Sequence, residues 1–435
     1  MKVFLGIDLG STTTKAVMLD ESGAALGRGI TNSRSDYHLA ADLAKDEAFI
    51  GARFTLLERA LAELKTEQSE VEAFRKRLLH QFRRQQYLTQ LATLRDTCLE
   101  NAAAGKYFEK PEALVERLKK LFGALDEEAR RPLLTAPKSD FFRDRASSSY
   151  AKVAEKIADR DVQFDAMMGV FDKSIIQVEN RRMDLSFEGN IRPALEAALG
   201  GEVDRKDGGY AKAVQRAIDT PLDVAQGIGT GYGRARLPFP KESIRSEILC
   251  HGLGAHSMYS GTRTVLDIGG QDTKAIQVDD RGIVTSFQMN DRCAAGCGRY
   301  LGYIADEMNL GLHELGPLAM DAKRTVKINS TCTVFAGAEL RDRLSMGQRR
   351  EDILAGLHRS IILRAMALLA RSGGVADEFT FTGGVANNVA AVRALRELIS
   401  ENYGERTINI SPSSIYTGAL GAALFALRAQ EGATA

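Results

Sequence analysis

The sequence has few cysteines, nearly balanced charge and no long uninterrupted apolar run, and each shortage excludes a class of protein. Five cysteines in 435 residues are too few for the disulfide framework of a small secreted domain. They form no CxxC pair, which argues against a zinc finger or a thioredoxin-like site. They also lack the CxxxCxxC spacing of radical enzymes. The five are Cys98, Cys250, Cys293, Cys297 and Cys332.

Charge and hydropathy exclude two further classes. A formal net charge of +1 gives no general attraction to nucleic acid or to a membrane surface. No apolar run reaches the ~18 residues that a membrane span requires. The N-terminal MKVFLGIDLG passes directly into a motif, without the long apolar core and cleavage site of a signal peptide. We therefore expect a cytoplasmic protein with neither nucleic-acid nor membrane partners.

Two textures divide the chain. Residues 1–34, and the chain after about 205, alternate short apolar strands, glycine turns and helices. Residues 36–204 instead repeat apolar positions every three or four residues, which is typical of amphipathic helices. In this block Pro111 begins one predicted helix and the serines at 147–149 cap another. We predict a first lobe at 1–35 and 205–262, an all-helical insertion at 36–204, and a second lobe with a C-terminal connecting helix at 263–435.

The insertion carries a basic cluster, which we define as Arg75, Lys76, Arg77, Arg83 and Arg84. The simplest interpretation is a solvated helix face. The alternative is a docking surface for an acidic partner protein.

Two segments far apart in the chain share one pattern. GIDLGSTTTK (6–15) and LDIGGQDTK (266–274) each run from an apolar strand through Asp, Gly and polar residues to Lys, which indicates an internal duplication. Glycines let backbone N–H groups approach phosphate oxygens, and Asp at a strand end can hold Mg²⁺ or orient a water. The catalytic candidates are Asp8, Asp267 and Gln271. The phosphate-binding candidates are Gly10, Ser11, Thr12, Thr13, Lys15, Gly269, Gly270, Asp272, Thr273 and Lys274.

A third glycine turn follows in FTGGVANN (381–388). Gly383 and Gly384 would let an adenine or ribose lie against bare backbone, and Asn387 and Asn388 would open a helix as caps or as polar ligands. Further on, Gly418 and Gly421 are small enough for two helices to cross closely, at a hinge between lobes.

This set of motifs resembles the actin/Hsp70/sugar-kinase ATPase superfamily. The resemblance implies an α/β fold of two ribonuclease-H-like lobes that close on ATP and Mg²⁺, here with the helical insertion in the first lobe. It does not by itself select a function, because that fold serves kinases, chaperones and filaments.

The cysteine segments resemble a narrower group. NDRCAAGCGRY and NSTCTVFAGAEL, with TGYGR and SEILCHG before them, are similar to the BadF/BcrA/HgdC-type activator ATPase family of 2-hydroxyacyl-CoA dehydratases and benzoyl-CoA reductases. The resemblance implies that Cys293 and Cys332 ligate one [4Fe-4S] cluster shared across a dimer interface. Four thiolates then come from two subunits. We expect Cys293 at the start of a helix running from about Ala294, and Cys297 and Cys250 as non-ligating residues.

The length of the helical block departs from the short activators. Together with RCAAGCGRYLGYIADEM, it is most similar to the larger ATPase subunit of ATP-dependent (class I) benzoyl-CoA reductase. The resemblance implies a subunit that uses ATP to pass low-potential electrons from a ferredoxin-like donor to catalytic reductase subunits, paired with a second related ATPase chain or with itself. The alternatives are a homodimeric activator of a 2-hydroxyacyl-CoA dehydratase, a small-molecule kinase of the same fold, and an Hsp70-like or actin-like binding protein.

Overall fold

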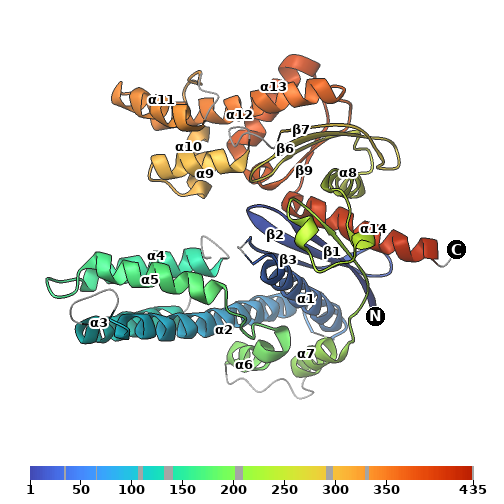
Figure 1. Cartoon of the computed structure of the whole chain (residues 1–435). Coiled ribbons are helices and arrows are strands. Elements are labelled where there is room, and N and C mark those ends of the chain that lie inside the picture. Colours follow the sequence, from blue (N-terminus) through green and yellow to red (C-terminus); the bar gives the residue numbers. More distant parts are fainter. Residues whose placement is uncertain are drawn as a thin grey trace. The chain divides into compact units, whose positions relative to one another are not determined.

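The computed structural model describes residues 1–33, 36–64, 66–105, 111–131, 141–200, 209–290, 297–328 and 333–433 (Figure 1). Its contacts form two compact units. One unit joins Met1–Ala48 to Leu222–Ala435, and the other is Phe49–Pro221. Helix α1 (Tyr37–Ala62) runs from the first unit into the second. The boundaries predicted at 36 and 204 for the insertion stay a prediction.

The first sheet contains four strands in the order β3-β2-β1-β4. Antiparallel pairing of β1 with β2 puts Asp8 opposite Lys15, and parallel pairing of β1 with β4 puts Asp8 beside Thr230. Apolar residues of β1 and β2 are buried under the alanines of α1 and α14. The strands are β1 (Lys2–Leu9), β2 (Thr13–Leu19), β3 (Ala25–Asn32) and β4 (Asp223–Thr230), and α14 is Thr417–Ala433.

The second sheet repeats this arrangement in the order β7-β6-β5-β8-β9. Asp267 on β5 lies opposite Lys274 on β6 and beside Thr382 on β8. The matching registers confirm the internal duplication. The strands are β5 (Thr264–Ile268), β6 (Thr273–Val278), β7 (Val284–Asn290), β8 (Phe379–Thr382) and β9 (Ile408–Ile410).

Helices pack on the second sheet (Figure 1). They bury a large apolar core, in which Phe379 and Phe381 of β8 are fully covered. The helices are α8 (Glu247–Met258), α9 (Gly298–Glu307), α10 (Leu312–Met320), α11 (Thr333–Ser345), α12 (Arg350–Ser372) and α13 (Val389–Tyr403). Short 3-10 turns lie at Arg234–Arg236, Lys241–Ser243, Gly384–Asn387 and Ser414–Tyr416.

Helices α8 and α14 cross at glycines. A Cβ built on Gly421 would lie 1.8 Å from the Cys250 carbonyl oxygen, and one on Gly254 would lie 2.1 Å from the Thr417 carbonyl oxygen. Only glycine permits two helix backbones to approach this closely. Helix α8 packs its other face on the second sheet, through Ile248, so the crossing lies between the two sheets.

The unit Phe49–Pro221 contains helices alone among its described residues. Helices α2, α3, α4 and α5 lie side by side (Figure 1) and enclose its core. Within this core Tyr150 donates a hydrogen bond to the Met167 carbonyl. Helix α3 begins at Pro111, as predicted. The predicted serine cap is wrong, because α4 begins at Phe142 and the serines lie inside it. The helices are α2 (Gln68–Ala103), α3 (Pro111–Arg130), α4 (Phe142–Ile157), α5 (Phe164–Glu179), α6 (Phe187–Leu199) and α7 (Gly209–Asp219).

Helix α12 is the one segment, among the residues described, with the length and apolar composition of a membrane span. Of its most apolar window, 72% is buried against the rest of the chain. That burial is typical of a core helix, and α12 lies in the core of the second sheet.

Candidate nucleotide site

The two aspartates of the duplicated hairpins are buried and paired with lysines. Asp8 is 4% exposed and Asp267 is 1% exposed. Lys15 Nζ lies 3.5 Å from Asp8 Oδ2, and Lys274 Nζ lies 3.5 Å from Asp267 Oδ2. The two strand ends therefore present equivalent carboxylate–lysine pairs.

The turns of the two hairpins meet. A Cβ built on Gly270 would lie 2.1 Å from Thr12 Oγ1, so the second turn contacts the first through a glycine. Gly10 is similarly close to its own hairpin, because a Cβ there would lie 3.1 Å from Lys15 Nζ. The structure thus brings the predicted phosphate-binding residues of both hairpins into one place.

The remaining hairpin candidates differ in exposure. Thr12 is exposed, Ser11 and Thr13 are half-buried, and Gln271 is half-buried in the second turn. Thr273 is 1% exposed and pairs with Asn290 inside the sheet. Its hydroxyl is therefore the least accessible of the predicted phosphate ligands.

The partner strands add a feature that the sequence patterns did not predict. Thr230 ends β4 beside Asp8, and Thr382 ends β8 beside Asp267; each is followed by a glycine with positive φ, +94° at Gly231 and +85° at Gly383. A Cβ on Gly231 would lie 2.4 Å from Asp8 Oδ1. The repeated Thr-Gly after each strand was the available signal.

Helix α8 supplies two more buried groups, Glu247 and His251, which lie one turn apart. His251 Nδ1 is 3.1 Å from Asp267 Oδ1, although the N–H direction does not make an aligned hydrogen bond. Burial raises the pKa of Glu247, an effect that the nearby Lys274 opposes. The SEILCHG motif drew attention to its cysteine, and Cys250 is fully buried.

Electrostatics hold the Asp267 carboxylate in its charged form. Burial alone would raise the pKa of Asp267, but the charges of His251 and Lys274 lower it well below the usual range. Burial likewise opposes the charge of Lys274, whereas Asp267 and Asp272 raise its pKa. Lys274 Nζ lies 2.6 Å from Asp272 Oδ1, so its charge is shared between two carboxylates.

The third glycine turn presents a bare backbone on one side. Gly383 is buried, and a Cβ there would lie 2.3 Å from the Ile268 carbonyl oxygen. Gly384 and Asn387 are exposed. The helix cap is Asn388, whose side chain accepts hydrogen bonds from the N–H groups of Ala390 and Ala391. Of the two predicted caps, Asn388 is thus the cap, and the role of Asn387 as a polar ligand stays a prediction.

Cys293 and Cys332 lie outside the described residues, but the start of α9 corrects one expectation. The helix begins at Gly298, and Cys297 before it is extended, with φ −139° and ψ 178°. A helix running from Ala294 is therefore wrong. The first N–H groups of α9, at Gly298 and Arg299, each donate a 2.8 Å hydrogen bond to the carbonyls of Gly269 and Gly270. The turn of the second hairpin thus accepts hydrogen bonds from two N–H groups at the start of this helix, which have no partner within the helix.

The donor set fits a nucleotide-bound Mg²⁺. Such an ion takes one or two carboxylates and completes its shell with water and phosphate oxygens. Asp8 and Asp267 are a set of that size. No cluster of three or more His, Cys, Asp or Glu side chains suited to a metal occurs within the described ranges.

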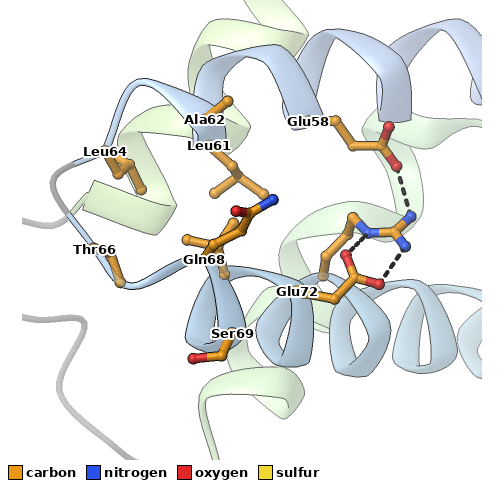
Figure 2. Close-up of a pocket in the computed structure, with 10 residues that line it drawn as sticks. Glu58, Leu61, Ala62, Leu64, Thr66, Gln68, Ser69 and Glu72 are labelled. Atoms are coloured by element: carbon orange, nitrogen blue, oxygen red, sulfur yellow. Dashed lines mark hydrogen bonds and ion pairs between the residues drawn. The ribbon is translucent and has the colours of Figure 1, made fainter.

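A separate cavity of about 960 Å³ lies in the helical unit, between the end of α1 and the start of α2 (Figure 2). Glu58 and Glu72 at its edge both accept hydrogen bonds from Arg75. Lys76 also pairs with Glu72, and Arg77 donates to the Ala198 carbonyl. These members of the basic cluster already have partners, which favours a solvated helix face.

The two sheets and the paired hairpins are those of the two-lobed α/β class, and a solved structure supports that fold over nearly the whole chain. Component A of (R)-2-hydroxyglutaryl-CoA dehydratase from Acidaminococcus fermentans has a TM-score of 0.52 and 23% identity, and the match covers 99% of this chain and 100% of that one. The predicted fold class is confirmed.

The chain belongs to the BadF/BadG/BcrA/BcrD ATPase family, which it matches over residues 5–426. It is 40% identical over 225 residues to the activator of lactoyl-CoA dehydratase from Anaerotignum propionicum, covering 50% of this chain and 84% of that protein. It is 34% identical over 175 residues to one of the subunits of benzoyl-CoA reductase from Thauera aromatica, covering 40% of this chain and 62% of that relative.

Proposed function

We propose that this chain is an ATP-hydrolysing, [4Fe-4S]-holding electron activator, which couples ATP hydrolysis to low-potential electron transfer from a ferredoxin-like donor to catalytic subunits acting on a CoA thioester. Membership of the ATPase family supports the hydrolysis. The names of the relatives, a dehydratase activator and a reductase component, support the partner class. They favour an activator over the small-molecule kinase or the binding protein.

In this proposal the duplicated hairpins bind the triphosphate. Backbone N–H groups at Gly10 and Gly270 bind phosphate oxygens, and Asp8 and Asp267 hold Mg²⁺ or orient the attacking water. The Gly269 N–H instead donates a 3.0 Å hydrogen bond to the Asp272 carbonyl and shapes the turn. Bound Mg²⁺ would neutralise charge on the phosphates. Lys15, which is partly exposed, contributes charge to the phosphates. Lys274 is buried against two carboxylates, so its role is to fix Asp267.

The cysteines available for a cluster are few. Cys98 and Cys250 are both 0% exposed, and burial raises the pKa of each thiol to about 12. Neither therefore lies at a surface where two subunits could share a cluster. Cys297 is 1% exposed in the core of the second sheet. We propose Cys293 and Cys332 as the two ligands from this chain. A bound [4Fe-4S] cluster would supply a one-electron carrier.

One observation supports a coupling between ATP hydrolysis and the cluster. The backbone N–H groups of Gly298 and Arg299 donate hydrogen bonds to the turn of the second hairpin, at Gly269 and Gly270. The segment before Gly298 contains Cys293. A displacement of the turn on ATP hydrolysis would therefore be transmitted along a few peptide units to a cluster ligand. Only a ligand that binds two conformations with different affinity can drive such a movement.

An electron paramagnetic resonance experiment tests the coupling. Oxygen-free, dithionite-reduced protein should give a cluster signal whose shape differs between ADP and a non-hydrolysable ATP analogue. Gly298→Ala should reduce that difference, because the new Cβ would lie 3.2 Å from the Gly269 carbonyl oxygen. Gly302→Ala is the matched control in α9, since a Cβ there meets nothing within 4 Å. A nucleotide-insensitive signal in the wild type, or an unchanged response in Gly298→Ala, would contradict the proposal.

Two partner systems fit this activity. We propose the benzoyl-CoA reductase system, in which the chain pairs with a second, related ATPase subunit. The 40% identity to a dehydratase activator supports the alternative, a homodimer serving a 2-hydroxyacyl-CoA dehydratase. Purification under anaerobic conditions separates them, because co-purification of a related second ATPase chain favours the reductase and its absence favours the dehydratase.

A further inference from the structure

His251 of α8 contacts the carboxylate of Asp267 in the second hairpin. The sequence patterns gave this histidine no role. Its side chain is 9% exposed, and Nδ1 lies 3.1 Å from Asp267 Oδ1, in an electrostatic contact that is not an aligned hydrogen bond. The same oxygen accepts a 2.8 Å hydrogen bond from the Thr382 hydroxyl. Oδ1 thus has two close partners. Oδ2 has one longer ion pair, at 3.5 Å from Lys274 Nζ, and keeps capacity to accept from a metal-bound or attacking water.

The other ring nitrogen faces the first hairpin. A Cβ built on Gly418 of α14 would lie 2.7 Å from His251 Nε2 and 3.0 Å from Asp8 Oδ2. The two atoms therefore border the same small space, which is open because residue 418 has no side chain. Through its two nitrogens, one imidazole lies near the carboxylates of both duplicated hairpins.

The surrounding charges are compatible with this position. Burial by itself would lower the pKa of His251, but Asp267 and, more weakly, Asp8 outweigh burial and raise it, against the opposing charge of Lys274. Glu247, one turn earlier in α8, is the remaining acidic group of the helix at this place.

We propose that His251 is a positioning residue for ATP hydrolysis: together with Thr382 it holds Oδ1 of Asp267, so that Oδ2 faces the reacting water or its metal, and Gly418 keeps open the space that the ring needs beside Asp8. This inference rests on the role proposed above for Asp267. It does not depend on the cluster or on the electron-transfer partner.

Two substitutions at position 251 separate the contributions of the ring nitrogens. His251→Asn places an amide near the position of Nδ1, and His251→Gln places one near Nε2. We expect His251→Gln to lower kcat for ATP hydrolysis about 10- to 100-fold, as loss of a ligand-orienting group does, with KM changed much less. His251→Asn should recover a substantial part of kcat. Equal kcat losses in both variants, an unchanged kcat, or a loss confined to KM would overturn the proposal.

His256→Gln is the matched control, since His256 lies in the same helix and its Nδ1 is 3.4 Å from the Thr262 carbonyl, away from the aspartates. It should hydrolyse ATP as the wild type does. Thermal unfolding of each variant identifies any loss of fold. The assay is phosphate release by the full purified protein, so its result is independent of electron transfer.

A double mutant tests the role of Gly418. Gly418→Ala should lower kcat, because the methyl group would occupy the space between His251 and Asp8. Combined with His251→Gln, it should cause no larger loss than the stronger single change, since both act on one arrangement. Losses that multiply would show independent effects and reject the shared role. If Gly418→Ala fails to fold, the two substitutions at position 251 still test the positioning role of His251.

Discussion

At the scale of single residues, the two hairpins are duplicated in register but not in environment. The side chain of Lys15 is 13% exposed beside Asp8. The side chain of Lys274 is 3% exposed, and its one charge is shared between Asp267 and Asp272. The first lysine can therefore serve a ligand, whereas the second is needed to keep a buried carboxylate compensated.

This difference predicts that replacing each lysine with methionine has a different main effect: a loss of stability at Lys274 and a weaker affinity for ATP at Lys15. Lys274→Met should lower the free energy of unfolding by about 3 kcal/mol or more, because it leaves a buried carboxylate with less compensation. Lys15→Met should destabilise the protein less, because Lys15 is the more exposed lysine and compensates one carboxylate where Lys274 compensates two, and it should raise KM for ATP. Urea unfolding and steady-state hydrolysis measure the two effects. Equal destabilisation by both substitutions would contradict the proposed division of roles.

At this scale the residues of the two hairpins could be predicted from sequence, whereas His251 and Thr230 could not, for physical reasons. Asp8 with Lys15, and Asp267 with Lys274, lie opposite each other in hairpins, so local spacing was sufficient to pair them. His251 reaches Asp267 only through packing of α8, which no local pattern encodes. Thr230 was missed because its strand was not recognised.

At the scale of elements, β4 was the main omission. Its sequence DVAQGIGT is rich in glycine and half exposed, so it lacks the alternation that identifies a strand. Parallel pairing with β1 forms it. The start of α9 was predicted too early, also because of a partner distant in sequence. The first N–H groups of α9 donate hydrogen bonds to the turn of the second hairpin, and local sequence does not encode this contact.

The crossing of α8 and α14 gives a prediction about stability. Gly421→Ala should destabilise the protein by about 3 kcal/mol or more, because overpacking against a backbone carbonyl at 1.8 Å forces two helices apart. The control is Gly123→Ala in α3, where a Cβ meets nothing within 4 Å. That change should stabilise by up to about 1 kcal/mol, since alanine favours a helix interior. Thermal unfolding compares them, and similar melting temperatures would refute the tight crossing.

At the scale of the whole molecule, the sequence was sufficient for the architecture: two sheets with one repeated plan, and a helical block inserted after the third strand. The periodicity of Leu and Ala predicted the helices. The insertion's limits stay a prediction. Helix α1 continues without a break from one compact unit into the other, and an uninterrupted helix has no boundary signal.

The central claim, that this ATPase holds a metal–sulfur cluster between subunits through Cys293 and Cys332, is tested most directly by iron and acid-labile sulfide analysis of oxygen-free protein. Wild-type protein should contain iron and sulfide in equal amounts, about four of each per pair of subunits. Cys293→Ala and Cys332→Ala should each lose most of both, whereas Cys98→Ala, at a buried thiol in the helical unit, should keep them. Full retention of iron in both ligand variants would contradict the account.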